Sequence, residues 1–115
     1  MSEDKVGRRS PQDERWQECK RLVHLRDKNM CRFLKVLSAR EYMLFMDSNP
    51  AFINLLECAH VKSVGTHPEL CYDIDNIVLL NHTAHSRLDS ALDPVTGKRT
   101  TKAKIQEWWD RILAG

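Results

Sequence analysis

Residues 57–89, ECAHVKSVGTHPELCYDIDNIVLLNHTAHSRLD, decide how the chain folds. Within this stretch, residues 77–80 are apolar and partly β-branched, which suits a short buried strand. Asn81 follows directly and can cap a helix, whereas Gly65 and Pro68 mark a long loop upstream. The stretch therefore predicts a strand, a loop, a second strand and a helix, over 57–63, 64–74, 77–80 and about 82–91.

The expected helix places a histidine and a carboxylate one turn apart. His85 and Asp89 are four residues apart, so they share a helix face and can share a ligand. Such a pair is half of a site for a divalent cation. His60, in the first strand, would face this helix if the two strands form a hairpin packed against it. Histidine also suits a general base, because its unperturbed pKa is about 6.5.

The order of these residues resembles the motif of the HNH endonucleases, also called ββα-metal or His-Me finger nucleases. His60, Asn76 and His85 take the three motif positions, and Asp89 stands where some members place a further metal ligand. The similarity covers about 16–113, although only 57–89 is specific. Its other parts are Trp16, Arg26-Asp27 and Cys31, and two segments typical of phage or prophage members, 93–97 and 108–112.

The resemblance implies a small α+β fold. Its ββα-metal core would be a short β-hairpin plus the metal-bearing helix, flanked by N- and C-terminal helices. The domain would span 12–115, after a flexible tail over 1–11.

The resemblance also implies metal-dependent hydrolysis of phosphodiester bonds in DNA, rather than RNA. His60 would activate water as the general base, and Asn76 would support the loop and help hold His60. His85 and Asp89 would bind the metal ion, for which Mg²⁺ is favoured and Mn²⁺ or Zn²⁺ are alternatives. The candidate nucleic-acid contacts are Arg87, His82 and Lys62.

Two departures from the family pattern leave alternatives open. Ala59 stands where many members carry a metal ligand, so the chain could be an inactive nuclease fold that only binds nucleic acid. The four cysteines form no Cys-x-x-Cys pair, which argues against a zinc knuckle.

Two further alternatives concern other residues. His67 with Cys71 and Cys58 could form a second metal site, and the other interpretation is that the two thiols are simply buried. A protein-interaction factor, such as a phage protein acting on a host enzyme, is the remaining alternative.

The flanking sequence predicts further helices. One covers about 12–27, and another covers 39–47, with a capping box from Ser38 and Glu41. A last helix, capped by Thr100 or Thr101, runs to about 113. Residues 31–37 fit either a strand or a turn into a helix, and 51–56 fit a short helical turn.

Composition sets broad limits. A chain of 115 residues makes one domain at most. Its net charge of +2 is too small to indicate nucleic-acid binding by itself. No apolar run approaches the roughly 20 residues that cross a bilayer, and residues 1–15 lack the apolar core of a secretory signal. We therefore expect a cytoplasmic protein, bacterial or phage-encoded, with reduced cysteines.

Overall fold

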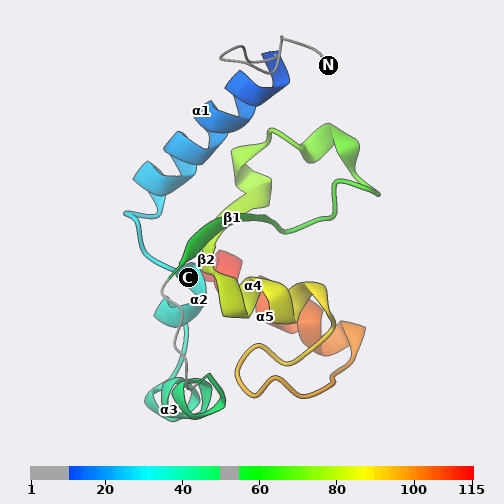
Figure 1. The fold of residues 1–115 in the computed structure, drawn as a ribbon. Helices are drawn as coiled ribbons and strands as arrows, with labels where there is room; N and C mark the ends of the chain where they lie inside the picture. The colour runs from blue at the N-terminus through cyan, green and yellow to red at the C-terminus, as the bar shows by residue number, and fades with distance from the viewer. Residues whose placement is uncertain (1–10, 50–54) are drawn as a thin grey trace, which may run out of the picture.

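The computed structural model describes residues 11–49 and 55–115 and combines helices with one β-hairpin, so the α+β prediction is confirmed (Figure 1). The elements in chain order are α1 (Pro11–Arg26), α2 (Arg32–Lys35), α3 (Ala39–Ser48), β1 (Leu56–His60), the 3-10 turns η2 (Pro68–Leu70) and η3 (Ile74–Asn76), β2 (Ile77–Asn81), α4 (His82–Asp89) and α5 (Lys102–Ala114). None of these helices has the length and apolar character needed to cross a membrane.

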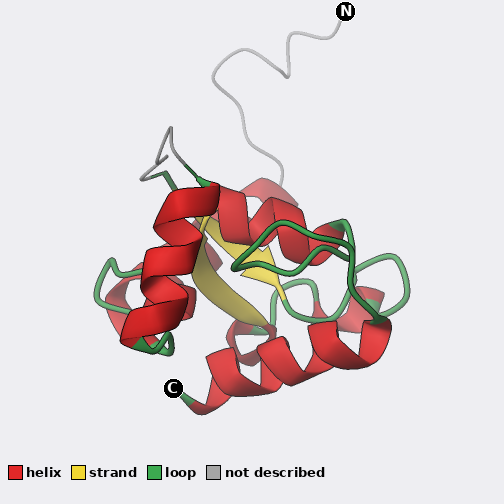
Figure 2. Cartoon of the chain, turned by 90° about the horizontal axis from the view of Figure 1, so that it is seen from below, coloured by secondary structure: helices red, strands yellow, loops and turns green. Residues whose placement is uncertain are grey.

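The hairpin lies at the centre of the fold, with helices around it (Figure 2). β1 and β2 are antiparallel, in a register that pairs Leu56 with Asn81 and His60 with Ile77. All of β2 is buried, because alternate residues serve two different cores. Ile77 and Leu79 pack with α1, whereas the other strand face packs with α2, α3, α4 and α5. That larger core includes Val78, Leu80, Phe33, Phe45, Ala84, Leu88, Trp109 and Ile112.

Local capping signals in the sequence correctly locate three helix starts. The Asn81 side chain accepts a hydrogen bond from the N–H of Ala84, and Thr101 caps α5 in the same way. Ser38 and Glu41 form the expected capping box, with bonds of 3.1 and 2.9 Å. These short polar side chains satisfy backbone N–H groups that the first helical turn leaves without partners.

Several predicted boundaries differ from the structure. The undecided segment 31–37 contains a short helix, α2. Pro11, assigned to the tail, begins α1, where a proline is favourable because no N–H is needed. The rest of that tail lies outside the described residues, as does most of the predicted turn over 51–56. Both the strand and the helix of the central stretch are shorter than expected, ending at His60 and Asp89.

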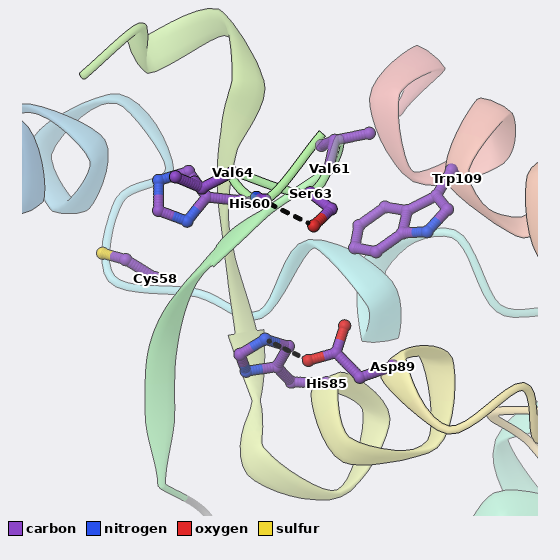
Figure 3. Close-up of a pocket in the computed structure, with 9 residues that line it drawn as sticks. Cys58, His60, Val61, Ser63, Val64, His85, Asp89 and Trp109 are labelled. Atoms are coloured by element: carbon purple, nitrogen blue, oxygen red, sulfur yellow. Dashed lines mark hydrogen bonds and ion pairs between the residues drawn. The ribbon is translucent and has the colours of Figure 1, made fainter. Parts of the chain in front are cut away.

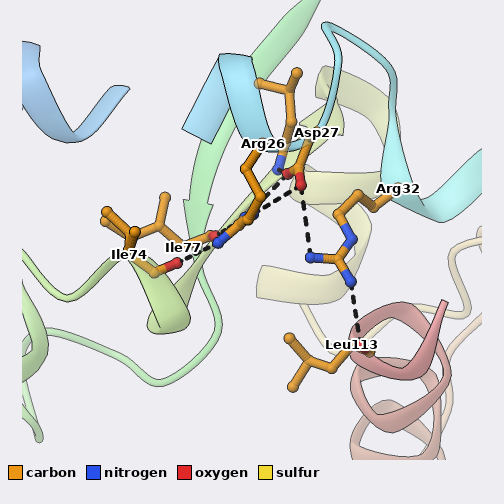
Figure 4. A network of polar contacts seen from close by, with 7 residues as sticks. Arg26, Asp27, Arg32, Ile74, Ile77 and Leu113 are labelled. Carbon is orange, nitrogen blue, oxygen red and sulfur yellow. Dashed lines mark hydrogen bonds and ion pairs between the residues drawn. The ribbon is translucent and has the colours of Figure 1, made fainter. Parts of the chain in front are cut away.

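A buried carboxylate ties α1 to the rest of the fold (Figure 4). Asp27 is only 5% exposed and accepts hydrogen bonds from Arg26 at 2.8 and 3.0 Å and from the N–H of Leu79 at 3.0 Å. Burial raises the pKa of Asp27, but the bonds from Arg26 and Leu79 outweigh it and leave the pKa below its usual value. Arg32 lies 3.6 Å from the same carboxylate and also donates to the carbonyl of Leu113 in α5.

A second ion pair joins α3 to α5. The two terminal guanidinium nitrogens of Arg111 donate to the carboxylate of Glu41, at 2.8 and 2.9 Å. These hydrogen bonds, opposed by burial and helped by the N–H of Ser38, lower the pKa of Glu41 to about 2. The pair is partly exposed, so water screens it and its contribution to stability is modest.

Replacing Glu41 by glutamine should lower the free energy of unfolding by about 1 kcal/mol at neutral pH. The folded carboxyl has the lower pKa, so the contribution is present above the unfolded value of 4.5 and is lost as the pH falls toward about 2. Urea denaturation at pH 7 and pH 3 measures this difference. Glu107→Gln is the control, because its contact with Lys104 is long, at 3.8 Å, and exposed. An unchanged difference between variant and wild type at the two pH values would contradict the prediction.

Candidate functional site

His60 ends β1 and is fixed by two contacts. Its ring stacks on that of Trp16 in α1, with the centroids 5.2 Å apart and the planes 18° apart. Its Nε2 lies 2.9 Å from the carbonyl oxygen of Cys71, which can only accept a hydrogen bond. Nε2 therefore carries the proton, and in the neutral ring Nδ1 is the basic nitrogen. Within the described part of the chain, Nδ1 makes no hydrogen bond.

The His60 side chain does not face α4, the helix predicted to carry the metal, contrary to the sequence prediction. Side chains alternate along a strand, so Cys58 and His60 point toward α1, while Ala59 points into the core that contains Ala84 of α4. Figure 3 shows His60 and Cys58 on one side of β1, and His85 on the other.

Asn76 holds the loop that supports His60. Its side chain is buried and accepts a hydrogen bond from the N–H of Lys62 at 2.8 Å, while its Nδ2 donates to the carbonyl of Lys62 at 3.1 Å. Nδ2 also lies 3.5 Å from the carbonyl of Leu70, next to Cys71, whose carbonyl binds His60. Asn76 thus braces both ends of the loop and acts on His60 through the backbone, not by direct contact.

His85 is oriented by an acid that sequence reasoning missed. Its Nδ1 lies 2.7 Å from Oε1 of Glu57 in β1, and its Nε2 lies 3.2 Å from Oδ2 of Asp89. The ring therefore offers Nε2 on the side of Asp89, as in metal-binding histidines whose other nitrogen donates to a carboxylate. His82 binds the second oxygen of Glu57, also at 2.7 Å.

The hydrogen bonds from His85 and His82 keep Glu57 in its carboxylate form. Burial raises the pKa of Glu57, but the hydrogen bonds and charges of His85 and His82 outweigh it and leave the pKa below its usual value. No pattern in the sequence marks Glu57, because its position follows from the strand register that the structure shows. This register pairs Glu57 with Leu80, two residues before His82.

Three of the predicted residues, His60, His85 and Asp89, line one pocket of about 570 Å³. Among the described residues β1 pairs only with β2, so its other edge is open, and the pocket at this edge is lined by β1 side chains on one face and by α4 side chains on the other. The lining residues are Cys58, His60, Val61, Ser63, Val64, Gly65, His85, Asp89 and Trp109 (Figure 3). The pocket therefore presents a basic imidazole on one side and a histidine–carboxylate pair on the other.

The residues in this pocket fit a cation that takes few protein ligands. His85 Nε2 and Asp89 Oδ2 are close enough to bind one ion, whereas Ala59 is buried and offers no donor atom. Over residues 11–49 and 55–115, no three His, Cys, Asp or Glu side chains are placed to hold a metal. Mg²⁺ suits a two-donor site because it usually keeps several waters. A closed zinc site needs four protein ligands.

The alternative second metal site is not formed in the described structure. His67 Nδ1 lies 2.9 Å from the hydroxyl of Thr66, its immediate neighbour. Burial raises the pKa of Cys58, which keeps that thiol protonated rather than as the thiolate that binds metals.

The three predicted nucleic-acid contacts have different surroundings. The guanidinium of Arg87 is hydrogen-bonded within the fold, where it holds the turn over 93–97 against α3. It donates to the hydroxyl and carbonyl of Ser48 at 3.0 and 2.9 Å and to the carbonyls of Pro94 and Val95 at 3.0 and 3.3 Å. His82 is hydrogen-bonded to Glu57. Lys62 is exposed and lines a smaller pocket together with Asn76.

Comparisons with protein-family models, with curated proteins and with solved structures found no match to this chain.

Proposed function

We propose that this chain is a metal-dependent endonuclease of the HNH type that hydrolyses phosphodiester bonds in DNA. The observation that carries the proposal is the shared pocket of His60, His85 and Asp89. The central hairpin followed by α4 supports it, because this order of elements is what the ββα-metal core requires. A phosphate bound over the open edge of β1 would have the base on one side and the histidine–carboxylate pair on the other.

The reaction follows from the hydrogen-bond directions. Nδ1 of His60 takes a proton from a water molecule, which attacks phosphorus and displaces the sugar oxygen. The carbonyl of Cys71 keeps the other ring proton on Nε2 and steadies the charged ring once it forms. A divalent cation at His85 and Asp89 would offset the negative charge that grows on the phosphate and the leaving oxygen. Glu57 keeps Nε2 of His85 directed toward that position.

Nicking of supercoiled plasmid tests this function. The protein should nick DNA in the presence of Mg²⁺, Mn²⁺ or Zn²⁺, and EDTA should stop the reaction. Retention of DNA on a gel without cleavage in any metal would favour the inactive nuclease fold, which Ala59 motivates. Absence of both activities, together with a stoichiometric protein partner in a pull-down, would favour the interaction factor.

Replacing Glu57 by glutamine should weaken Mn²⁺ binding by about 10- to 100-fold. Glutamine has one acceptor oxygen for two imidazole N–H groups, so His85 loses its fixed orientation or its tautomer. Isothermal titration calorimetry or Mn²⁺ paramagnetic resonance measures the affinity without relying on cleavage. Glu14→Gln, at an exposed position on α1, should leave affinity unchanged. Equal affinity in Glu57→Gln and wild type would remove Glu57 from the metal site.

A further inference from the structure

Two cations of α1 lie on the side of the hairpin where His60 sits. Lys20 Nζ is 5.9 Å from the centroid of the Trp16 ring, and that ring stacks on His60. The guanidinium of Arg15 lies 4.2 Å from the centroid of the Tyr72 ring. Tyr72 directly follows Cys71, whose carbonyl binds His60. The Trp16 ring thus lies between Lys20 and His60, and the Tyr72 ring lies between Arg15 and the backbone that holds His60.

The charges of Arg15 and Lys20 are not neutralised within the described structure. Neither side chain forms an ion pair there, whereas two other arginines of α1 do. Arg21 takes the carboxylate of Glu18 at 2.6 Å, and Arg26 takes that of Asp27. Arg15 and Lys20, which lie over rings that contact His60 or follow Cys71, thus remain able to bind an external anion.

Lys20 is connected to the pocket through Trp16, whose ring lies between Lys20 and the pocket residue His60. Burial raises the pKa of Cys58, and the positive charge of Lys20 opposes that shift. Cys58 lines the pocket on the same side of β1 as His60 (Figure 3). An anion held by Lys20 would therefore lie next to the pocket.

We infer that Arg15 and Lys20 of α1 form a phosphate-binding surface for duplex DNA, flanking the pocket on the His60 side. The inference rests on the proposed function and adds the path of the bound strand. The strand crosses the open edge of β1 at the pocket and continues along α1, where each cation binds a phosphate. Cations that contact phosphates contribute to affinity by releasing counterions, so their effect depends on salt concentration.

The double variant Arg15→Gln/Lys20→Gln tests this surface. Its control is Lys98→Gln/Lys102→Gln, which removes the same charge from exposed positions before and at the start of α5. Binding to a fluorescent duplex is measured by anisotropy in EDTA, from about 50 to 200 mM salt, so that cleavage plays no part. The α1 variant should bind about tenfold or more weakly at low salt, and the slope of log affinity against log salt should flatten by about 2.

Each outcome decides one of the two proposals. The same loss of slope in both variants, or no loss in either, overturns the α1 surface even if the wild type nicks plasmid. A loss confined to the α1 variant supports the surface, and absence of nicking in every metal then overturns only the nuclease. A wild type that does not bind the duplex in low salt overturns the surface directly.

Discussion

His60→Ala should lower the rate of plasmid nicking by about 10²- to 10⁴-fold, the range typical of losing a general base. The alanine side chain cannot accept the proton that attacking water must lose. Metal binding should persist, because His85, Asp89 and Glu57 lie on the other side of β1. Single-turnover nicking measures the rate, and Mn²⁺ titration measures the retained site.

Two further variants separate chemistry from folding. Alanine at position 60 removes the ring that stacks on Trp16, so His60→Gln is a gentler replacement that keeps bulk and an N–H for the carbonyl of Cys71. His24→Ala is the matched control, because the His24 side chain lies on α1 and hydrogen-bonds to Asn29 in the exposed turn after that helix. If His60→Gln nicks within threefold of wild type while remaining folded, another group must be the base.

Asp27→Ala should lower the free energy of unfolding by about 3–5 kcal/mol, the usual result of removing one partner from a buried ion pair. The change leaves the N–H of Leu79 without its acceptor and leaves Arg26 and Arg32 without their anion. Urea denaturation followed by tryptophan fluorescence gives the measurement.

The matched control for this loss is Asp47→Ala, at an exposed position of α3. Asp27→Asn should fall between alanine and wild type, since its amide oxygen can still accept from Leu79. If Asp27→Ala remains folded and loses less than about 1 kcal/mol, the network does not hold α1 to the hairpin in the way its geometry indicates.

The sequence predicted the parts of the site that depend on local order. The Asn81 cap determines where α4 begins and does not depend on what the helix packs against. The spacing of His85 and Asp89 then places them one turn apart on that helix. Asn76 is similar, since it closes a loop between two neighbouring strands.

The missed parts depend on which surfaces meet. Glu57 and His60 lie on opposite faces of β1, but the residues around them show no clear polar–apolar alternation. The sequence therefore did not reveal which face would pack on α4. Arg87 likewise appears in sequence only as a charge on a helix. Its partners are mainly backbone carbonyls, which any residue type provides, so no sequence motif marks them.

The Arg26–Asp27 pair also covers the outer edge of β2. The outward-facing edge of β2 would otherwise offer backbone groups to a strand of another molecule. Arg26 occupies the carbonyl of Ile77, Asp27 occupies the N–H of Leu79, and the sulfur of Cys31 accepts from the N–H of Asn81. These side chains occupy the backbone groups that a third strand would bind. A strand of another molecule therefore cannot form a full set of hydrogen bonds with the outer edge of β2.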